Sequence, residues 1–153
     1  WAVWLMKVAG ELLILTREHH SALSLANKCL NAVKANDEVE IQTLCAKISQ
    51  NFKMDFSEHF ETEESTIFAF LSEKSDDLAQ LCTQLTLEHQ QLYKIAGELL
   101  DQPDSLEKFG KLLKSHARLE NRVLFPNIDL LYAPQRRQIL NSSAKHGSAT
   151  IYE

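Results

Sequence analysis

The chain has 153 residues, of which 44% are hydrophobic and 24% charged, and its formal net charge is −5. This composition is typical of a folded globular protein and argues against disorder, while the acidic balance without a Lys/Arg cluster argues against a nucleic-acid groove. No apolar stretch reaches the ~20 residues that a membrane-spanning helix requires, so no membrane partner is expected. With only 4 Gly and 3 Pro, long helices are favoured over a turn-rich β-sandwich.

The cysteines and the N-terminal region indicate in which cellular compartment the protein is expected. Cys29, Cys45 and Cys82 lie far apart among apolar neighbours and lack C-x-x-C spacing, which favours buried free thiols in a reducing compartment. The short apolar run at 12–15 is flanked by Glu11 and lacks the features of a secretory signal. We therefore expect a cytoplasmic protein; a start at Met6 and a start further upstream both fit the sequence.

Helical periodicity runs through four long segments. The first is expected over 17–34 with Thr16 as its N-cap, and the second runs from a cap at Asn36 or Asp37 to about residue 72. The third begins after a cap at Ser75 and ends before Pro103.

The fourth segment begins at Asp104, which has capping-box spacing to Glu107, and Pro126 is expected to kink it near its end. Ala133 and Pro134 end this segment, and a short fifth helix is expected over 135–141. The sequence thus predicts an all-α protein: an up-down-up-down four-helix bundle with a short extra C-terminal helix. We expect one domain over 1–153, with its core at about 12–132 and a polar, fraying tail at 142–153.

Each of the four long helices places a histidine on its inward, otherwise apolar face. A lone inward His is more often a hydrogen-bonded core residue than a ligand, but four of the 6 histidines on such stripes are hard to attribute to chance. The stripes are Ala22, Ala26 and Leu30 with His19; Phe52, Phe56, Ile67 and Phe70 with His59 and Glu63; Leu85, Leu92 and Ala96 with His89; and Phe109, Leu112 and Val123 with His116 and Glu120.

Two His-x-x-x-Glu pairs sharpen this pattern. His59 and Glu63, and likewise His116 and Glu120, are four residues apart and share a helix face with about 5–6 Å between their Cβ atoms. With one His from each remaining helix, His19 and His89, they supply four imidazoles and two carboxylates. Two carboxylates can bridge two ions ~3.5–4 Å apart. Iron is the expected occupant, and manganese, zinc or a mixed site also fit these ligands.

The two glutamates need a positively charged partner. A buried carboxylate without a partner costs several kcal/mol, and no Lys or Arg lies on the stripes near Glu63 or Glu120. Metal ions are the simplest source of that charge.

The metal-ligand pattern occurs twice along the chain. Glu18-His19 followed by His59-x-x-x-Glu63 is repeated as Glu88-His89 followed by His116-x-x-x-Glu120. The repeat and the apolar stripe favour His19 over its neighbour His20 as ligand.

Other polar residues near these motifs are given less specific roles. Glu18 and Glu88 are either solvated surface acids or partners that hydrogen-bond a ligand. Glu61 and Glu64 are expected to face solvent. His146, in the polar tail, is not expected to be a ligand.

Four blocks resemble the hemerythrin-like (HHE cation-binding) domain family. They are Leu15-Thr-Arg-Glu-His19-His, His59-Phe-Glu-Thr-Glu63-Glu, Leu87-Glu-His89 and His116-Ala-Arg-Leu-Glu120-Asn-Arg-Val-Leu-Phe-Pro126. The last is the most specific, because these domains commonly follow the ligand Glu with Leu-Phe-Pro. The resemblance implies a four-helix bundle around an oxo- or hydroxo-bridged centre of two non-haem iron ions that meets O₂ or NO.

The histidine count differs from that of the oxygen-carrying hemerythrins, which place five histidines around their irons. Here Leu85 and Tyr93 stand four residues before and after His89, so the set is four His and two Glu. This is more similar to family members linked to nitric oxide stress, iron-centre repair or iron sensing. Tyr93 is a core aromatic by preference, with a ligand or a hydrogen-bond donor to bound gas as the alternatives.

Three functions remain open at this point. The leading one is a diiron protein that binds or senses O₂, NO or peroxide, or handles iron. The second is a diiron oxidase or peroxidase with the same ligands. The third is a bundle with a structural metal such as zinc and an interaction role. In addition, the apolar N-terminal segment with Trp1 and Trp4 is a candidate homodimer contact.

Overall fold

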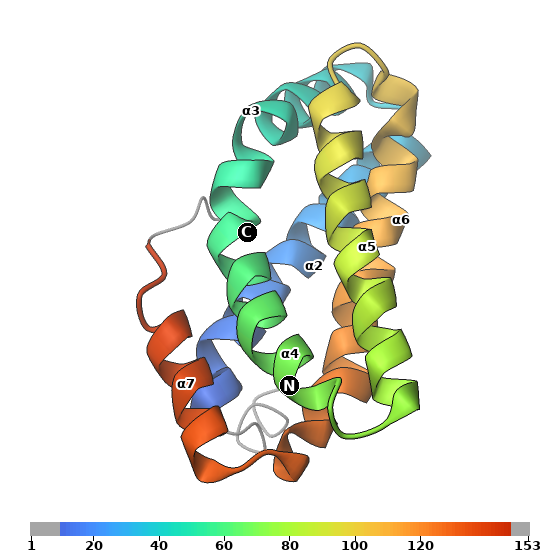
Figure 1. Ribbon diagram of the computed structural model, residues 1–153. Coiled ribbons are helices and arrows are strands. Elements are labelled where there is room, and N and C mark those ends of the chain that lie inside the picture. Colours follow the sequence, from blue (N-terminus) through green and yellow to red (C-terminus); the bar gives the residue numbers. More distant parts are fainter. Residues whose placement is uncertain (1–9, 148–153) are drawn as a thin grey trace.

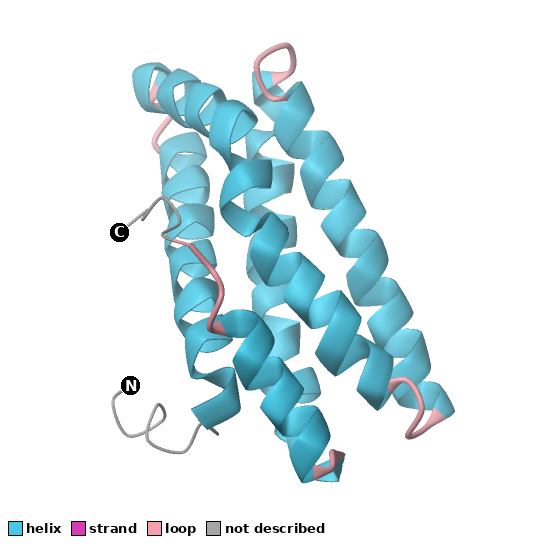
Figure 2. Cartoon of the chain, turned by 60° about the vertical axis from the view of Figure 1, so that its left-hand side comes forward, coloured by secondary structure: helices cyan, strands magenta, loops and turns pink. Residues whose placement is uncertain are grey.

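The computed structural model describes residues 10–147, and all regular secondary structure in that range is helical (Figures 1 and 2). The first long helix, α2 (Leu13–Lys34), follows a 3₁₀ turn, η1 (Gly10–Leu12), and the second, α3 (Glu38–Thr62), continues through the π-helix η2 (Glu63–Phe68) into α4 (Ala69–Leu71). The third is α5 (Asp76–Glu98). After the 3₁₀ turn η3 (Pro103–Ser105), α6 (Leu106–Leu119) continues into the π-helix η4 (Glu120–Leu124), the 3₁₀-helix η5 (Phe125–Leu130) and α7 (Ala133–Ser143).

The long helices form a bundle. Helices α2 and α5 each pack against both α3 and α6, and α7 lies outside the bundle against α3, η1 and η2 (Figure 1). Gly110 allows α6 to approach α2 closely, because an added Cβ would lie 3.1 Å from Cys29 Cβ and 3.2 Å from the Ala26 carbonyl oxygen. The structure thus confirms a helical bundle, while the strict up-down-up-down order stays a prediction.

Two of the predicted caps are confirmed. The Asp37 carboxylate accepts a hydrogen bond from the Glu40 amide, and the Ser75 hydroxyl accepts one from the Leu78 amide, both at 3.1 Å. Each satisfies a donor that the first helical turn leaves without an intrahelical partner. Asn36, with φ of 51°, ends the preceding helix in the left-handed region that Asn tolerates.

Several predicted helix ends were wrong. Thr16 is not a cap but a buried residue inside α2, which starts earlier because Leu12 and Leu15 are buried on the same face. The predicted Asp104 capping box does not form: Pro103 opens a 3₁₀ turn, and α6 begins without a side-chain cap.

The C-terminal region also differs from the expectation. Helix α7 begins at Ala133 rather than 135, because Pro134 occupies the first turn, where its missing N–H is not needed. The predicted polar tail from 142 is partly helix, and Gly147 still donates its amide to a Glu58 carboxylate oxygen at 2.9 Å.

Both π-helices begin at one of the two predicted ligand glutamates, Glu63 and Glu120. A π-helix changes which residues face inward, and such segments are frequent at functional sites. The predicted inward position of Val123 was therefore wrong: Val123 is 46% exposed, while Leu124 is fully buried.

The histidines and glutamates divide the hydrophobic core. One cluster is built around Leu25, Phe52, Leu92 and Phe109, and the other around Leu15, Leu71, Leu85 and Leu124. Along each long helix one cluster gives way to the other near the inward His.

Three sequence-level expectations concern the chain as a whole. Cys29, Cys45 and Cys82 are free and buried, as expected. Among the helices that the structure describes, none has the length and apolar character needed to cross a membrane. The proposed dimer contact at Trp1 and Trp4 lies outside the described residues.

Candidate metal centre

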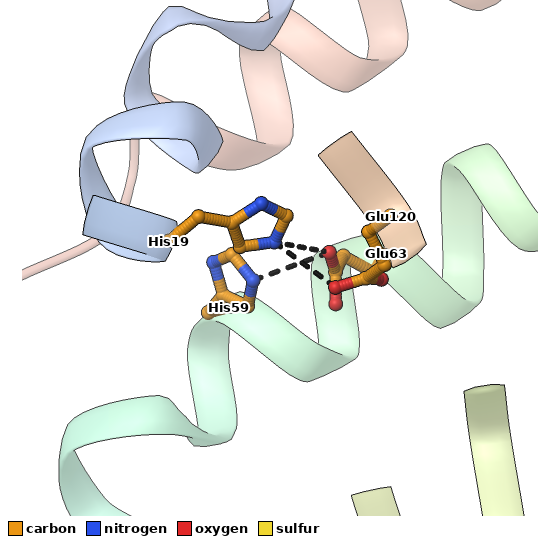
Figure 3. Close-up of side chains that lie close together, drawn as sticks. All are labelled: His19, His59, Glu63 and Glu120. Atoms are coloured by element: carbon orange, nitrogen blue, oxygen red, sulfur yellow. Dashed lines mark hydrogen bonds and ion pairs between the residues drawn. The ribbon is translucent and has the colours of Figure 1, made fainter. Parts of the chain in front are cut away.

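Six buried side chains meet in the middle of the bundle. They form two groups of four, each with its potential ligand atoms within 4.8 Å of one another. Both groups contain Glu63 and Glu120. The first adds His19 and His59 (Figure 3), and the second adds His89 and His116. The structure thus brings together all six predicted ligands, with the two glutamates between two pairs of histidines.

In both groups the Nε2 atoms face the shared carboxylates. His19 Nε2 lies 3.1 Å from Glu63 Oε2 and 3.0 Å from Glu120 Oε1, and His59 Nε2 lies 3.2 Å from Glu63 Oε2 (Figure 3). His89 Nε2 is 3.2 Å from Glu63 Oε1, and His116 Nε2 is 3.1 Å from Glu120 Oε1. The i,i+4 spacing predicted from the sequence accounts for one contact in each group.

The Nδ1 atoms all point the other way, to a polar partner on a different helical stretch. The four partners are Asn121 for His19 at 2.8 Å, Glu18 for His59 at 3.0 Å, Glu64 for His89 at 2.7 Å and Glu88 for His116 at 2.7 Å. Carboxylate and amide oxygens only accept, so Nδ1 carries the proton in each contact and the Nε2 lone pair is left for a metal.

The buried polar atoms fit a cation between them. Among the described residues, Glu63 Oε1, both Glu120 carboxylate oxygens, His89 Nε2 and His116 Nε2 have no hydrogen-bond partner, although they lie close to one another. A buried acceptor without a partner carries a desolvation cost of about 1–3 kcal/mol. Facing lone pairs from imidazole and carboxylate are the usual donors to a transition-metal ion, which would remove that cost.

The electrostatics also call for positive charge. Burial alone would lower the pKa of His59 and His116, but attraction to Glu63 and Glu120, respectively, outweighs it and raises the two values to about 9 and about 10. The pKa of His19 is likewise raised, by Glu120 and Glu63, against the effect of burial. For Glu63, burial would raise the pKa, but His59 and the other imidazoles hold it well below its usual range.

Aromatic rings enclose the cluster. Phe125 stacks on His19 with 4.9 Å between ring centroids, and Phe60 stacks on His89 at 3.8 Å. Phe68 covers the same His89 ring at 5.5 Å. These rings limit the movement of the imidazoles and exclude water from their faces.

The structure also places the residues for which the sequence left alternatives open. His19 is buried in the cluster and His20 is exposed. Glu18 and Glu88 are not solvated surface acids, because each bonds a His of the following long helix instead of its own neighbour. Tyr93 is a core aromatic against Phe60, outside both groups of potential ligands.

Sequence reasoning missed three of the outer residues. Glu64 was expected to face solvent, and its side chain is 41% exposed, yet its carboxylate bonds His89. Asn121 and His146 were given no part, and His146 lies 3.0 Å from both Glu18 carboxylate oxygens. The available signal for Glu64 and Asn121 was positional, since each directly follows one of the two ligand glutamates.

Comparison with protein families also indicates a metal site. The model of the hemerythrin HHE cation-binding domain matches residues 12–132. The chain belongs to this family. No match was found among curated proteins or among solved structures. Membership of a cation-binding family and the buried His/Glu cluster together indicate a metal cation site.

Proposed function

We propose that this hemerythrin-like chain holds two iron ions in the His/Glu cluster and uses them to bind or sense O₂, NO or peroxide. The observation that carries the proposal is the sharing of Glu63 and Glu120 by both four-residue groups. A single ion would leave one pair of histidines without a role. Two ions give every one of the six side chains a ligand function.

The type of ligand favours iron over a structural zinc site, because structural zinc sites usually contain Cys and this cluster contains only His and Glu. Each position has two imidazoles and oxygens from two shared carboxylates. Two His with carboxylate ligands and further open positions is typical of non-haem iron, which then accepts a small molecule. When bound, the irons supply the redox chemistry and the binding of the diatomic ligand.

The residues of the chain itself orient the imidazoles, keep water away from them and line a cavity beside His89. The Nδ1 partners hold each imidazole in one orientation, and Phe60 and Phe125 keep an apolar environment. A surface cavity of about 320 Å³ is lined by Glu64 and Phe68, which both contact His89. The largest described cavity, about 860 Å³, is lined by none of the six residues.

Metal content of the purified chain tests the proposal most directly. The chain is loaded with Fe²⁺ without oxygen, freed of excess metal and analysed by mass spectrometry, and about two irons per chain are expected. Exposure to O₂ or NO should then change the visible absorption spectrum. One zinc per chain, or no metal, would contradict the diiron proposal, and steady turnover of peroxide would favour an oxidase or peroxidase instead.

Variants of the shared glutamates test the ligand assignment. Glu63→Ala or Glu120→Ala should lose at least one ion while circular dichroism still reports a helical chain, because the two hydrophobic clusters remain. Glu61→Ala, an exposed residue of α3, is the matched control and should retain both ions. Retention of both ions by either cluster variant would refute the assignment.

A further inference from the structure

The two groups of ligands share their carboxylates but differ in what surrounds their histidines. We name the group with His19 and His59 position A, and the group with His89 and His116 position B. Since Glu63 and Glu120 belong to both, they contribute to both positions. Any difference in affinity must therefore arise at the four imidazoles and their partners.

At position B both imidazoles are bonded to carboxylates. His89 Nδ1 lies 2.7 Å from Glu64 Oε2, and His116 Nδ1 lies 2.7 Å from Glu88 Oε1. A carboxylate that accepts the Nδ1 proton increases the electron density at Nε2 and makes it a stronger metal ligand. Position B thus has two such imidazoles.

At position A only one partner is a carboxylate, and it is shared. His19 Nδ1 is bonded to the neutral Asn121 amide at 2.8 Å. His59 Nδ1 lies 3.0 Å from Glu18 Oε1, but both oxygens of that carboxylate also lie 3.0 Å from His146 Nδ1. At position B, by contrast, the second contact of Glu88 is the neutral Gln84 amide at 3.0 Å.

The difference arises at equivalent places in the two halves. Glu64 and Asn121 each directly follow a shared glutamate at the start of a π-helix, and each reaches an imidazole on another helix. Phe68 and Phe125, five residues after those glutamates, stack on the same two imidazoles, His89 and His19. With the backbone geometry repeated, the exchange of a carboxylate for an amide is the main chemical difference.

We propose that the two metal positions are inequivalent, and that position A, bounded by Asn121 and the shared Glu18, releases its ion before position B. This inference rests on the proposed function, because it presumes two ions. Changes of such outer partners commonly alter metal affinity by about 10–100-fold. The chain would therefore pass through a state with one ion held by His89, His116 and the two glutamates.

Stepwise removal of Fe²⁺ tests the order. The intact chain, loaded without oxygen, is mixed with an excess of EDTA, and the number of ions per chain is followed by native mass spectrometry. Two phases are expected, with the first at least about tenfold faster than the second. Fewer than two ions at the start would overturn the proposed function and this inference with it, whereas loss of both ions in one phase would overturn the inference alone.

Two reciprocal variants show which metal position loses its ion in each phase. Asn121→Asp gives position A a second carboxylate and should slow the first phase by about tenfold, toward the unchanged rate of the second. Glu64→Gln removes a carboxylate from position B and should speed the second phase by a similar factor, so that the phases merge. Asn27→Asp and Glu61→Gln, both at exposed sites, are the matched controls. Slowing of the second phase by Asn121→Asp, or acceleration of the first by Glu64→Gln, would reverse the order and overturn the inference.

Discussion

The first half of the bundle, α2 to η2, and the second half, α5 to η4, place the same chemistry at the same points. Each half supplies one His from its first helix and a His-x-x-x-Glu pair from its second, and in each the π-helix begins at that Glu. The halves differ in the outer contacts: Glu64 faces His89, whereas Asn121 faces His19.

This comparison separates two kinds of constraint. The inward His and Glu residues repeat because helix periodicity fixes where they can meet in the same cluster. The outer partners need only accept one hydrogen bond, which a carboxylate or an amide does equally well in geometry but not in charge. Variation outside the ligands can therefore make two similar metal positions behave differently.

Removal of one imidazole from each half should have the largest effect. His19→Ala and His89→Ala should each reduce bound iron from about two to about one per chain, because each leaves a position with a single imidazole. Metal analysis after gel filtration measures this. His20→Ala, in the exposed neighbour of His19, is the control. A greater loss in His20→Ala than in His19→Ala would mean that the position of the first ligand is wrong by one residue.

The next largest effect tests the π-helix of the second half. Leu124 is fully buried and Val123 is 46% exposed, so Leu124→Ala should destabilise the chain by about 2–5 kcal/mol and Val123→Ala by no more than about 0.5 kcal/mol. Urea unfolding of both variants measures the difference. Equal losses would indicate that η4 is a regular α-helix with Val123 facing the core.

These two predictions also show which features could be predicted from the sequence and which could not. The i,i+4 pairs, the inward histidines and the caps at Asp37 and Ser75 depend on one helix at a time, and local periodicity was sufficient to find them. The place of Val123 was wrong because a π-helix depends on how the chain packs around Glu120, which no local pattern encodes. Glu64, Asn121 and His146 were missed for a related reason: each contact joins residues far apart in the sequence.

The metal-free chain should lose stability as the pH rises, with the first half titrating before the second. In the folded chain the pKa of His59 is about 9 and that of His116 about 10, against about 6.5 when unfolded. Between the unfolded and the folded pKa values, the folded chain therefore binds more protons than the unfolded chain. The stabilisation is complete below pH of about 6.5 and is lost as the pH passes the two folded values.

Thermal unfolding in EDTA at pH 6, 8 and 10 (chosen as about equal steps across that range) measures this loss. The melting temperature should fall from each step to the next. The iron-loaded chain provides the contrast, because metal ions replace the imidazole protons and bind more tightly as the pH rises toward neutrality. A metal-free chain whose melting temperature rises with pH would show that the histidines are neutral in the fold.

The smallest expected effect concerns His146, whose contact to Glu18 exists only in the first half. Its Nδ1 meets both Glu18 oxygens, and its Nε2 lies 2.7 Å from the Thr62 hydroxyl, so it holds the carboxylate that orients His59. His146→Ala should slow loss of the first ion a few-fold, less than Asn121→Asp does, because Glu18 then bonds His59 alone. His146→Gln, which keeps a donor to Glu18, should reverse part of this slowing, and the exposed Lys145→Ala should change nothing. If His146→Ala lowers only the melting temperature and leaves both release phases unchanged, the residue fastens the C-terminal segment and does not position the metal ligand.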